Sequence, residues 1–337
     1  MDQSKNGETV NKQLLGYLRG HNGEITALAA GHPGADEIFS KIFISASRDK
    51  TILIWKINSN EEEAQKTMVF GEPWICLKGH NHFVSDLTLT KDNFHLFSSS
   101  WDKTIRIWDV KTGRCQQTFA SPAVKEITSV TISADSRKVF SSGLQNSIAL
   151  WTTKGKFVEA SKDRNHQDWV SKVRYSPSTK NDYLASVGWD GKLKIWFNNL
   201  NVKASFEAHD GPINALAIAS GGPFIATGGK DQFVKVWRVS SLDKVFQVSK
   251  CNSTVNDICF NPMYKFFAVA TNDQVLLYAL NASNTTDEKA SLVEPALKIE
   301  KDPKLGKYTS VAWASNSKHL FCGTSSGTIA VYRIDIK

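Results

Sequence analysis

The chain has 337 residues, of which 41% are hydrophobic and 22% are charged, a composition typical of a folded soluble protein rather than a disordered one. No apolar stretch reaches the roughly 18 to 20 residues that a membrane-spanning helix needs, and the polar start lacks the apolar core of a secretory signal. The formal net charge of +8 is compatible with a polyanionic partner such as a nucleic acid, and five cysteines without a CxxC pair indicate reduced thiols.

The first predicted element is a short β-patterned run at 13–18. It follows a polar N-terminal tail, 1–12, and precedes the dipeptide Gly20-His21. The run has no neighbouring strand of its own in the sequence, since the next β-patterned segments belong to a repeated unit. We therefore expect it to pair with a distant part of the chain.

The repeated unit is clearest at 79–110, which opens with Gly79-His80. Three β-patterned runs separated by turns follow, the third ending on Trp108, and a fourth run lies at 114–119. A Gly-His opening and a Trp-Asp ending around four strands is typical of a WD repeat, which folds as one blade of a β-propeller.

An aromatic residue ends the third strand of seven such units. These residues are Trp55, Trp108, Trp151, Trp196, Trp237, Tyr278 and Tyr332. Their intervals of about 40 to 55 residues suit propeller blades. The two longest intervals predict loops that project from blades at about 58–73 and 281–307.

The last unit ends with its third strand, at 328–334, and lacks a fourth. The run at 13–18 supplies one, and this pairing would remove the exposed edges that an open array of blades leaves. The sequence thus predicts an all-β fold, a seven-bladed WD-repeat β-propeller closed by its N-terminal strand, as a single domain at 13–337.

Four units share a His, a Ser or Thr, an Asp and the Trp at one spacing, which predicts a hydrogen-bonded tetrad inside each blade. The four sets are His21, Ser45, Asp49 and Trp55; His80, Ser98, Asp102 and Trp108; His166, Ser186, Asp190 and Trp196; and His209, Thr227, Asp231 and Trp237. The other three units lack the set, because Gln145, Asn272 and Ser326 replace the Asp.

A recurring Ser, His and Asp can also suggest a nucleophilic triad, but four copies at a repeat-locked spacing favour a structural role. The chain has no P-loop, HExxH or GxSxG motif and no GxGxxG after a strand. His80 and His82 form an HxH pair that no cysteine or carboxylate cluster completes. We therefore predict no enzyme activity, no catalytic residue, no metal, no cofactor and no small-molecule substrate.

The residues beside the tetrad Asp lie in a turn at one rim of the predicted ring. In the first two units these residues are Arg48, Lys50, Trp101 and Lys103. A basic cluster with an aromatic residue suits the recognition of phosphates and exposed bases. A solvated turn whose Trp packs on a neighbouring blade is the alternative, and the residue chemistry alone leaves both open.

Several segments make a more specific resemblance, to the family of the receptor for activated C kinase. They lie at 18–23 (LRGHNG), 45–51 (SASRDKT), 79–86 (GHNHFVSD) and 169–177 (WVSKVRYSP), with 188–190 and 228–231 extending a match from about 16 to 334. The resemblance implies a non-enzymatic scaffold on the head of the small ribosomal subunit, near the mRNA exit. It also implies contacts with ribosomal RNA and neighbouring ribosomal proteins, docking of C-type protein kinases and other signalling proteins, and a cytoplasmic, ribosome-associated location without membrane insertion.

In that family an Arg-Asp-Lys turn of the first blade contacts the ribosome, and Arg48 and Lys50 match it here. Lys103, Arg19 and Lys12 are added as RNA-binding candidates because we expect them nearby in the first two blades. The candidate contacts for protein partners, all at the tetrad turns, are Trp101, Trp189 and Lys230.

Two alternatives stay open, a signalling adaptor independent of the ribosome and a subunit resembling the G-protein β subunit. The second needs a long N-terminal helix, whereas only a dozen polar residues precede the closing strand. The insertion after Trp55, with its acidic run Glu61, Glu62 and Glu63, and the segment 281–307 depart from the family pattern and affect contacts specific to particular relatives.

Overall fold

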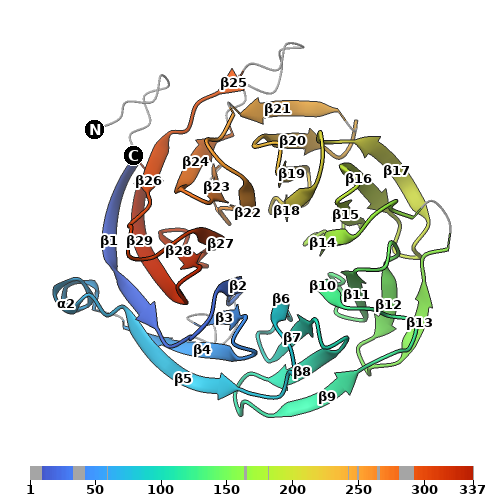
Figure 1. Cartoon of the computed structure of the whole chain (residues 1–337), viewed down its shortest axis with the longest axis horizontal. Coiled ribbons are helices and arrows are strands. Elements are labelled where there is room, and N and C mark those ends of the chain that lie inside the picture. Colours follow the sequence, from blue (N-terminus) through green and yellow to red (C-terminus); the bar gives the residue numbers. More distant parts are fainter. Residues whose placement is uncertain are drawn as a thin grey trace.

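Short β-branched runs joined by tight turns make each repeat fold as an antiparallel sheet, and the sheets stand around a central axis (Figure 1). The computed structural model describes residues 10–32, 42–58, 60–162, 165–180, 182–241, 243–248, 250–263, 266–280 and 292–336. Within them there are seven sheets, each with at least four strands. This confirms the predicted seven-bladed propeller.

The blades are numbered here in chain order, with the innermost strand first. Blade 1 contains β2 (Ile25–Ala30), β3 (Phe43–Ser47), β4 (Ile52–Ile57) and β5 (Gly71–Leu77); blade 2, β6 (Val84–Leu89), β7 (His95–Ser100), β8 (Ile105–Asp109) and β9 (Cys115–Phe119); blade 3, β10 (Ile127–Ile132), β11 (Lys138–Gly143), β12 (Ala149–Thr152) and β13 (Phe157–Ala160). Blade 4 contains β14 (Val170–Tyr175), β15 (Leu184–Gly188), β16 (Lys192–Trp196) and β17 (Val202–Glu207); blade 5, β18 (Ile213–Ile218), β19 (Phe224–Gly229), β20 (Val234–Arg238), β21 (Lys244–Val248) and β25 (Leu292–Val293). Blade 6 contains β22 (Val255–Phe260), β23 (Phe266–Thr271), β24 (Gln274–Ala279) and β26 (Leu297–Glu300); blade 7, β27 (Tyr308–Trp313), β28 (His319–Thr324), β29 (Thr328–Ile336) and β1 (Val10–Arg19).

The N-terminal strand closes the ring, as predicted. β1 pairs antiparallel with β29, with Leu14 opposite Tyr332 and Arg19 opposite Thr328, and the two strands lie side by side in Figure 1. β1 begins at Val10, so the last three residues of the predicted tail 1–12 belong to the propeller. Residues 1–9 lie outside the described part of the chain.

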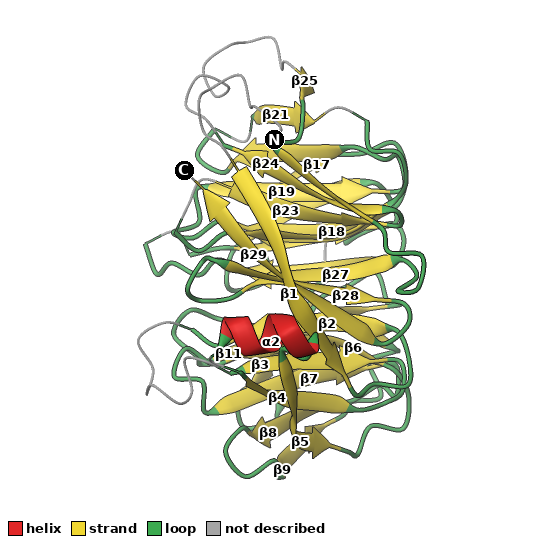
Figure 2. Ribbon diagram, turned by 90° about the vertical axis from the view of Figure 1, so that its left-hand side faces the viewer, coloured by secondary structure: helices red, strands yellow, loops and turns green. Residues whose placement is uncertain are grey.

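The expectation of a projecting loop at 58–73 is wrong, because the segment forms a helix and then enters β5. Helix α2 (Glu61–Thr67) begins after Asn60, whose side chain accepts a hydrogen bond from the amide of Glu63. Ala64 is buried on its inner side, and α2 lies against β1 (Figure 2). This helix is short, and no helix in the described ranges is long and apolar enough to cross a membrane.

The end of α2 is bonded to the closing strand. The Tyr17 amide donates to the Met68 carbonyl at 3.0 Å, and the Phe70 amide donates to the Tyr17 carbonyl at 3.1 Å. A Cβ atom on Gly16 would lie 2.9 Å from the Met68 carbonyl carbon, so this approach requires glycine. The Glu61 carboxylate also contacts His319 and Arg333 of blade 7, at 2.8 and 3.3 Å. The insertion therefore fastens blade 1 to blade 7.

The prediction of a projecting loop at 281–307 is also partly wrong. β26 lies within it and forms the fourth strand of blade 6, paired with β24. β25 lies within it as well and pairs in parallel with β21 of blade 5. Residues 281–291 are outside the described ranges, so the expectation for them is untested.

A ring of hydrogen bonds joins the seven innermost strands around the channel. In each blade the second residue of the innermost strand donates from its side chain to the carbonyl of the first residue in the next innermost strand. The donors and acceptors are Thr26 and Val84, Ser85 and Ile127, Thr128 and Val170, Ser171 and Ile213, Asn214 and Val255, Asn256 and Tyr308, and Thr309 and Ile25. The distances range from 2.5 to 3.2 Å, and the last bond returns to blade 1.

Candidate nucleic-acid and partner interface

The tetrad of blade 2 is an unbroken chain of short hydrogen bonds. The distance from Asp102 Oδ2 to His80 Nδ1 is 2.8 Å, and the distance from His80 Nε2 to Ser98 Oγ is 2.7 Å. Trp108 Nε1 donates to the same Ser98 oxygen at 2.8 Å. In this arrangement His80 donates to the Asp102 carboxylate and accepts from Ser98. The four side chains of this tetrad thus satisfy one another's hydrogen bonds inside the blade.

Blades 1, 4 and 5 contain the same chain of bonds. Their His–Asp distances are 2.8 to 2.9 Å, and their His–Ser or His–Thr distances are 2.8 Å. Burial opposes ionisation of Asp49, but hydrogen bonds from His21 and Thr51 outweigh it and hold the pKa of Asp49 well below its usual value. These carboxylates are therefore charged and internally occupied, so the tetrads act as a brace.

The residue after the tetrad Asp has an unusual backbone. In blades 1 and 2 these residues are Lys50 and Lys103, with φ of 74° and 70°, the left-handed region that favours glycine. Blades 4 and 7 have Gly191 and Gly327 at the equivalent position, with φ of 74° and 83°. The turn geometry therefore extends across blades with different side chains, and it presents a lysine only in blades 1 and 2.

Arg48 belongs to a cluster that spans blades 1 and 2, the blade 1–2 cluster, made of Arg48, His82, Phe83 and Trp101. The guanidinium carbon of Arg48 lies 5.3 Å from the centre of the Phe83 ring. The half-buried Trp101 stacks on His82, with ring centres 5.9 Å apart. Arg48 Nε also lies 3.6 Å from a Glu24 oxygen, yet 53% of the Arg48 side chain remains exposed. Trp101 thus packs on its own blade and keeps part of its surface open.

The other basic candidates are not all brought to this cluster. Lys103 Nζ lies 3.5 Å from a Glu126 oxygen of blade 3. Arg19 ends β1 two residues before His21, on the tetrad side of the ring, and its guanidinium covers the Tyr17 ring at 5.1 Å. Lys12 lies seven residues earlier in β1, about 23 Å along an extended strand, and it hydrogen-bonds to the Lys298 carbonyl. The expectation that Lys12 lies near Arg48 is therefore wrong.

A second aromatic and cationic group, the blade 4–5 cluster, contains Trp169, Trp189 and Lys230. The two indole rings are 4.7 Å apart, and the Lys230 ammonium lies 4.5 Å from the Trp189 ring centre. Trp169 is 37% exposed and Trp189 is half-buried. Trp169 was not among the sequence candidates, although it begins one of the segments that carried the resemblance.

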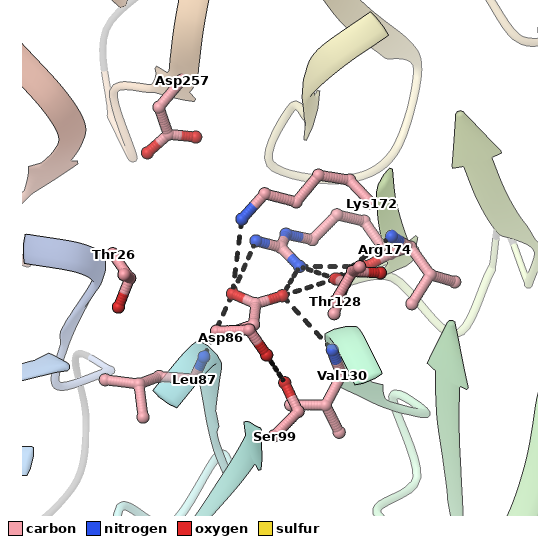
Figure 3. Close-up of polar contacts among 12 residues, drawn as sticks. Thr26, Asp86, Leu87, Ser99, Thr128, Val130, Lys172, Arg174 and Asp257 are labelled. Carbon is pink, nitrogen blue, oxygen red and sulfur yellow. Dashed lines mark hydrogen bonds and ion pairs between the residues drawn. The ribbon is translucent and has the colours of Figure 1, made fainter. Parts of the chain in front are cut away.

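The channel holds a charged group that the sequence did not reveal (Figure 3). The Arg174 guanidinium makes two contacts with the Asp86 carboxylate, at 2.6 and 3.1 Å, and Lys172 Nζ lies 3.7 Å from the same carboxylate. Burial alone would raise the pKa of Asp86, but Arg174 and Lys172 lower it to about 2.

Asp257 points into the channel from blade 6 and accepts a hydrogen bond from the Val311 amide at 3.1 Å. Burial raises the pKa of Asp257 despite Lys172.

This channel group lies close to the blade 1–2 cluster. A hollow of 280 Å³ at the mouth of the channel is lined by Arg48, Phe83, Trp101 and Lys172, together with hydroxyls of the ring of hydrogen bonds. The candidate RNA-binding surface thus continues into the channel mouth. Among the described residues, no group of three or more His, Cys, Asp and Glu side chains has a geometry suited to a metal ion.

Comparison with known proteins identifies similar chains. The family described as "WD domain, G-beta repeat" matches residues 12–56, 71–109, 113–152, 160–196 and 200–238. "Small ribosomal subunit protein RACK1" of Drosophila melanogaster is 33% identical over 326 residues, which cover 96% of this chain and 98% of the relative. "Cross-pathway control WD-repeat protein 2" of Flammulina velutipes is 32% identical over 324 residues, with coverage of 96% and 98%.

Proposed function

The chain belongs to the WD-repeat family and is a RACK1-like member of it, and we propose that it is a non-enzymatic scaffold bound to the small ribosomal subunit. Under this proposal it resides in the cytoplasm with the ribosome, on the head of the subunit near the mRNA exit. The observation that supports it best is the similarity to a small-subunit protein over nearly the whole of both chains, together with the exposed basic turn of blade 1.

Ribosomal RNA is the proposed partner of Arg48 and Lys50. Arg48 keeps half of its side chain exposed, and Lys50 is exposed at the tip of its turn. Their charges suit phosphate oxygens, and the half-buried Trp101 beside them offers a surface for an unpaired base. Arg19 and Lys103 are peripheral members of this site, since Lys103 is partly neutralised by Glu126. Lys12 is left out because of its place on β1.

Protein partners, including C-type kinases and other signalling or translation factors, are the proposed ligands of the blade 4–5 cluster. Trp189 and Lys230, with Trp169 beside them, combine large apolar area with a fixed cation, the composition of interface hot spots. Blades 1 and 2, around Trp101, would then bind RNA and neighbouring ribosomal proteins, while blades 4 and 5 stay available for the other protein partners. No catalytic role is proposed, because the Ser, His and Asp groups are bonded within the tetrads.

Sedimentation of the Arg48→Asp, Lys50→Glu double variant in cell extract tests this function. We expect the variant to leave the small-subunit fractions at a salt concentration where the wild type still sediments with them, because phosphate contacts dominate such affinities. A matched control is Lys91→Glu with Lys111→Glu, which reverses two exposed charges in blade 2 loops on the other face of the ring. Retention of the Arg48 and Lys50 variant on subunits in high salt would refute the proposed site.

A further inference from the structure

A groove lies between blades 4 and 5 on the face opposite the tetrad turns. The tetrad turn of blade 4 follows β15 at Trp189, whereas the groove is lined by the loop that precedes β15, so the two lie at opposite ends of the same strand. The groove has a volume of 560 Å³ and is formed by loops of both blades together with Lys203 of β17, and the strands of the two blades adjoin in Figure 1. It is thus separate from both clusters described above.

The floor of the groove is apolar and fixed. Pro223, Phe224 and Val239 line it, and the Tyr183 hydroxyl donates to the Gly222 carbonyl at 3.0 Å, which ties the loop of blade 5 to blade 4. Burial raises the pKa of Tyr183, so this phenol stays neutral and keeps donating. A partner would therefore meet a preformed surface that can hold one apolar side chain.

The rim of the groove is positively charged. Lys180, Lys203 and Arg238 line it against one acid, Asp182. The Asp182 carboxylate already accepts hydrogen bonds from the Tyr175 hydroxyl and from Asn198 Nδ2. Lys180 and Lys203 are exposed, and neither forms an ion pair with any residue of the described ranges. The rim therefore carries positive charge that the fold does not neutralise.

The small number of free charges on the rim limits which polyanion it can hold. Arg238 is engaged within the fold, so the two lysines provide the free charge. Each lysine ammonium group acts as a separate point charge, so the two can pair with separate carboxylates spaced along an acidic segment. Nucleic acid would need more basic residues than this rim has, because contacts with several phosphates supply most of its affinity.

We propose that this groove binds a carboxylate-rich segment of a partner protein, with acidic side chains on Lys180 and Lys203 and one apolar side chain on Phe224. The Lys203 ammonium also lies 6.0 Å from the ring of Phe197, which is 48% exposed, so an apolar patch continues beyond the groove. The proposal adds a docking site that does not depend on the ribosomal function. Both faces of the ring can then be occupied together.

Fluorescence anisotropy tests it with a short fluorescein-labelled peptide in which glutamates flank a single phenylalanine. Lys180→Glu with Lys203→Glu should weaken binding about tenfold or more, because two attractive charge contacts become repulsive. The control Lys91→Glu with Lys111→Glu, in loops of blade 2 on the same face, should bind like the wild type. Thermal unfolding of both variants should match the wild type, since all four lysines are exposed.

Three outcomes would overturn the proposal. The first is equal binding by the groove variant and the control variant. The second is equal binding of a peptide with alanine in place of phenylalanine, which would exclude a role for the apolar floor. The third is displacement of the peptide from the wild type by single-stranded RNA but not by an unlabelled acidic peptide. Because Arg48→Asp with Lys50→Glu lies on the other face, it should leave peptide binding intact whether or not the ribosomal proposal holds.

Discussion

Lys50 of blade 1 occupies the turn position that Gly327 occupies in blade 7, and both have a left-handed backbone, with φ of 74° and 83°. A residue with a Cβ atom pays about 1 to 2 kcal/mol for this conformation. The Lys50 side chain is exposed and forms no ion pair with a described residue, so nothing in the fold explains why lysine stands there. We attribute its presence to the charge that it offers a partner.

Lys50→Gly should separate stability from binding. We expect the variant to be as stable as the wild type or up to about 1 kcal/mol more stable, because the relief of the left-handed strain exceeds or balances the extra entropy of an unfolded glycine. Its affinity for small subunits should fall at the same time. Urea unfolding and subunit binding measured on one preparation check both parts, and a variant that loses stability without losing affinity would contradict this account of Lys50.

Asp86→Asn should destabilise the propeller by about 3 kcal/mol, since it leaves the Arg174 guanidinium in the channel without its carboxylate. This expected loss is small for the breaking of a buried ion pair, because 27% of the Arg174 side chain is exposed to solvent. Equilibrium unfolding in urea measures the change. The double variant Asp86→Asn with Arg174→Gln should recover part of the loss, and an additive double variant would show that the pair does not act as a unit.

Asp257→Asn should stabilise the protein at neutral pH. Burial raises the pKa of Asp257, so the folded state favours the protonated carboxyl. Stability from this group is then fully present below its usual pKa of 3.8 and is lost as the pH rises through the higher folded value. Asparagine is neutral throughout and its carbonyl can still accept from the Val311 amide. The melting temperature of the variant should be higher than that of the wild type at pH 7, and the difference should vanish below about pH 3.8. A constant difference would mean that ionisation is not the cause.

Thr309→Val tests the ring of inner hydrogen bonds. It removes the 2.6 Å bond to the Ile25 carbonyl, which joins blade 7 to blade 1, and should cost about 1 kcal/mol in unfolding free energy. Thr128→Val removes the equivalent 2.6 Å bond between blades 3 and 4 and serves as the comparison. Similar losses would show that the ring contributes evenly, whereas no loss in either variant would show that channel water replaces these bonds.

The repeat made most of the fold predictable. Short strands, turns and the recurring Trp depend on local chemistry at a fixed period, so they can be read without knowing which segments meet. The four tetrads followed from the same period. Closure by β1 was predictable because one unit lacked a strand and one strand lacked a unit.

The remaining features depend on contacts across blades or on a weak local signal. Asp86 and Arg174 are 88 residues apart, and only the ring places them together. Lys12 precedes blade 1 in the sequence, but it lies near the start of β1, at the end of blade 7 that is opposite the tetrad turns. The signal for helix α2 was the Asn60 cap followed by an acidic first turn. The same run of glutamates is also typical of a solvated loop, so the local sequence favoured neither structure.

The salt dependence of binding to purified small subunits tests the central claim most directly. Affinity is measured by equilibrium titration over a series of KCl concentrations for the wild type, for Arg48→Gln with Lys50→Gly, and for Lys12→Gln with Lys91→Gln as a control of equal charge away from the site. If Arg48 and Lys50 contact phosphates, the slope of log affinity against log salt should become less negative by about 2 in the first variant and stay unchanged in the control. A slope equal to that of the wild type in the Arg48 and Lys50 variant would contradict an RNA contact by blade 1.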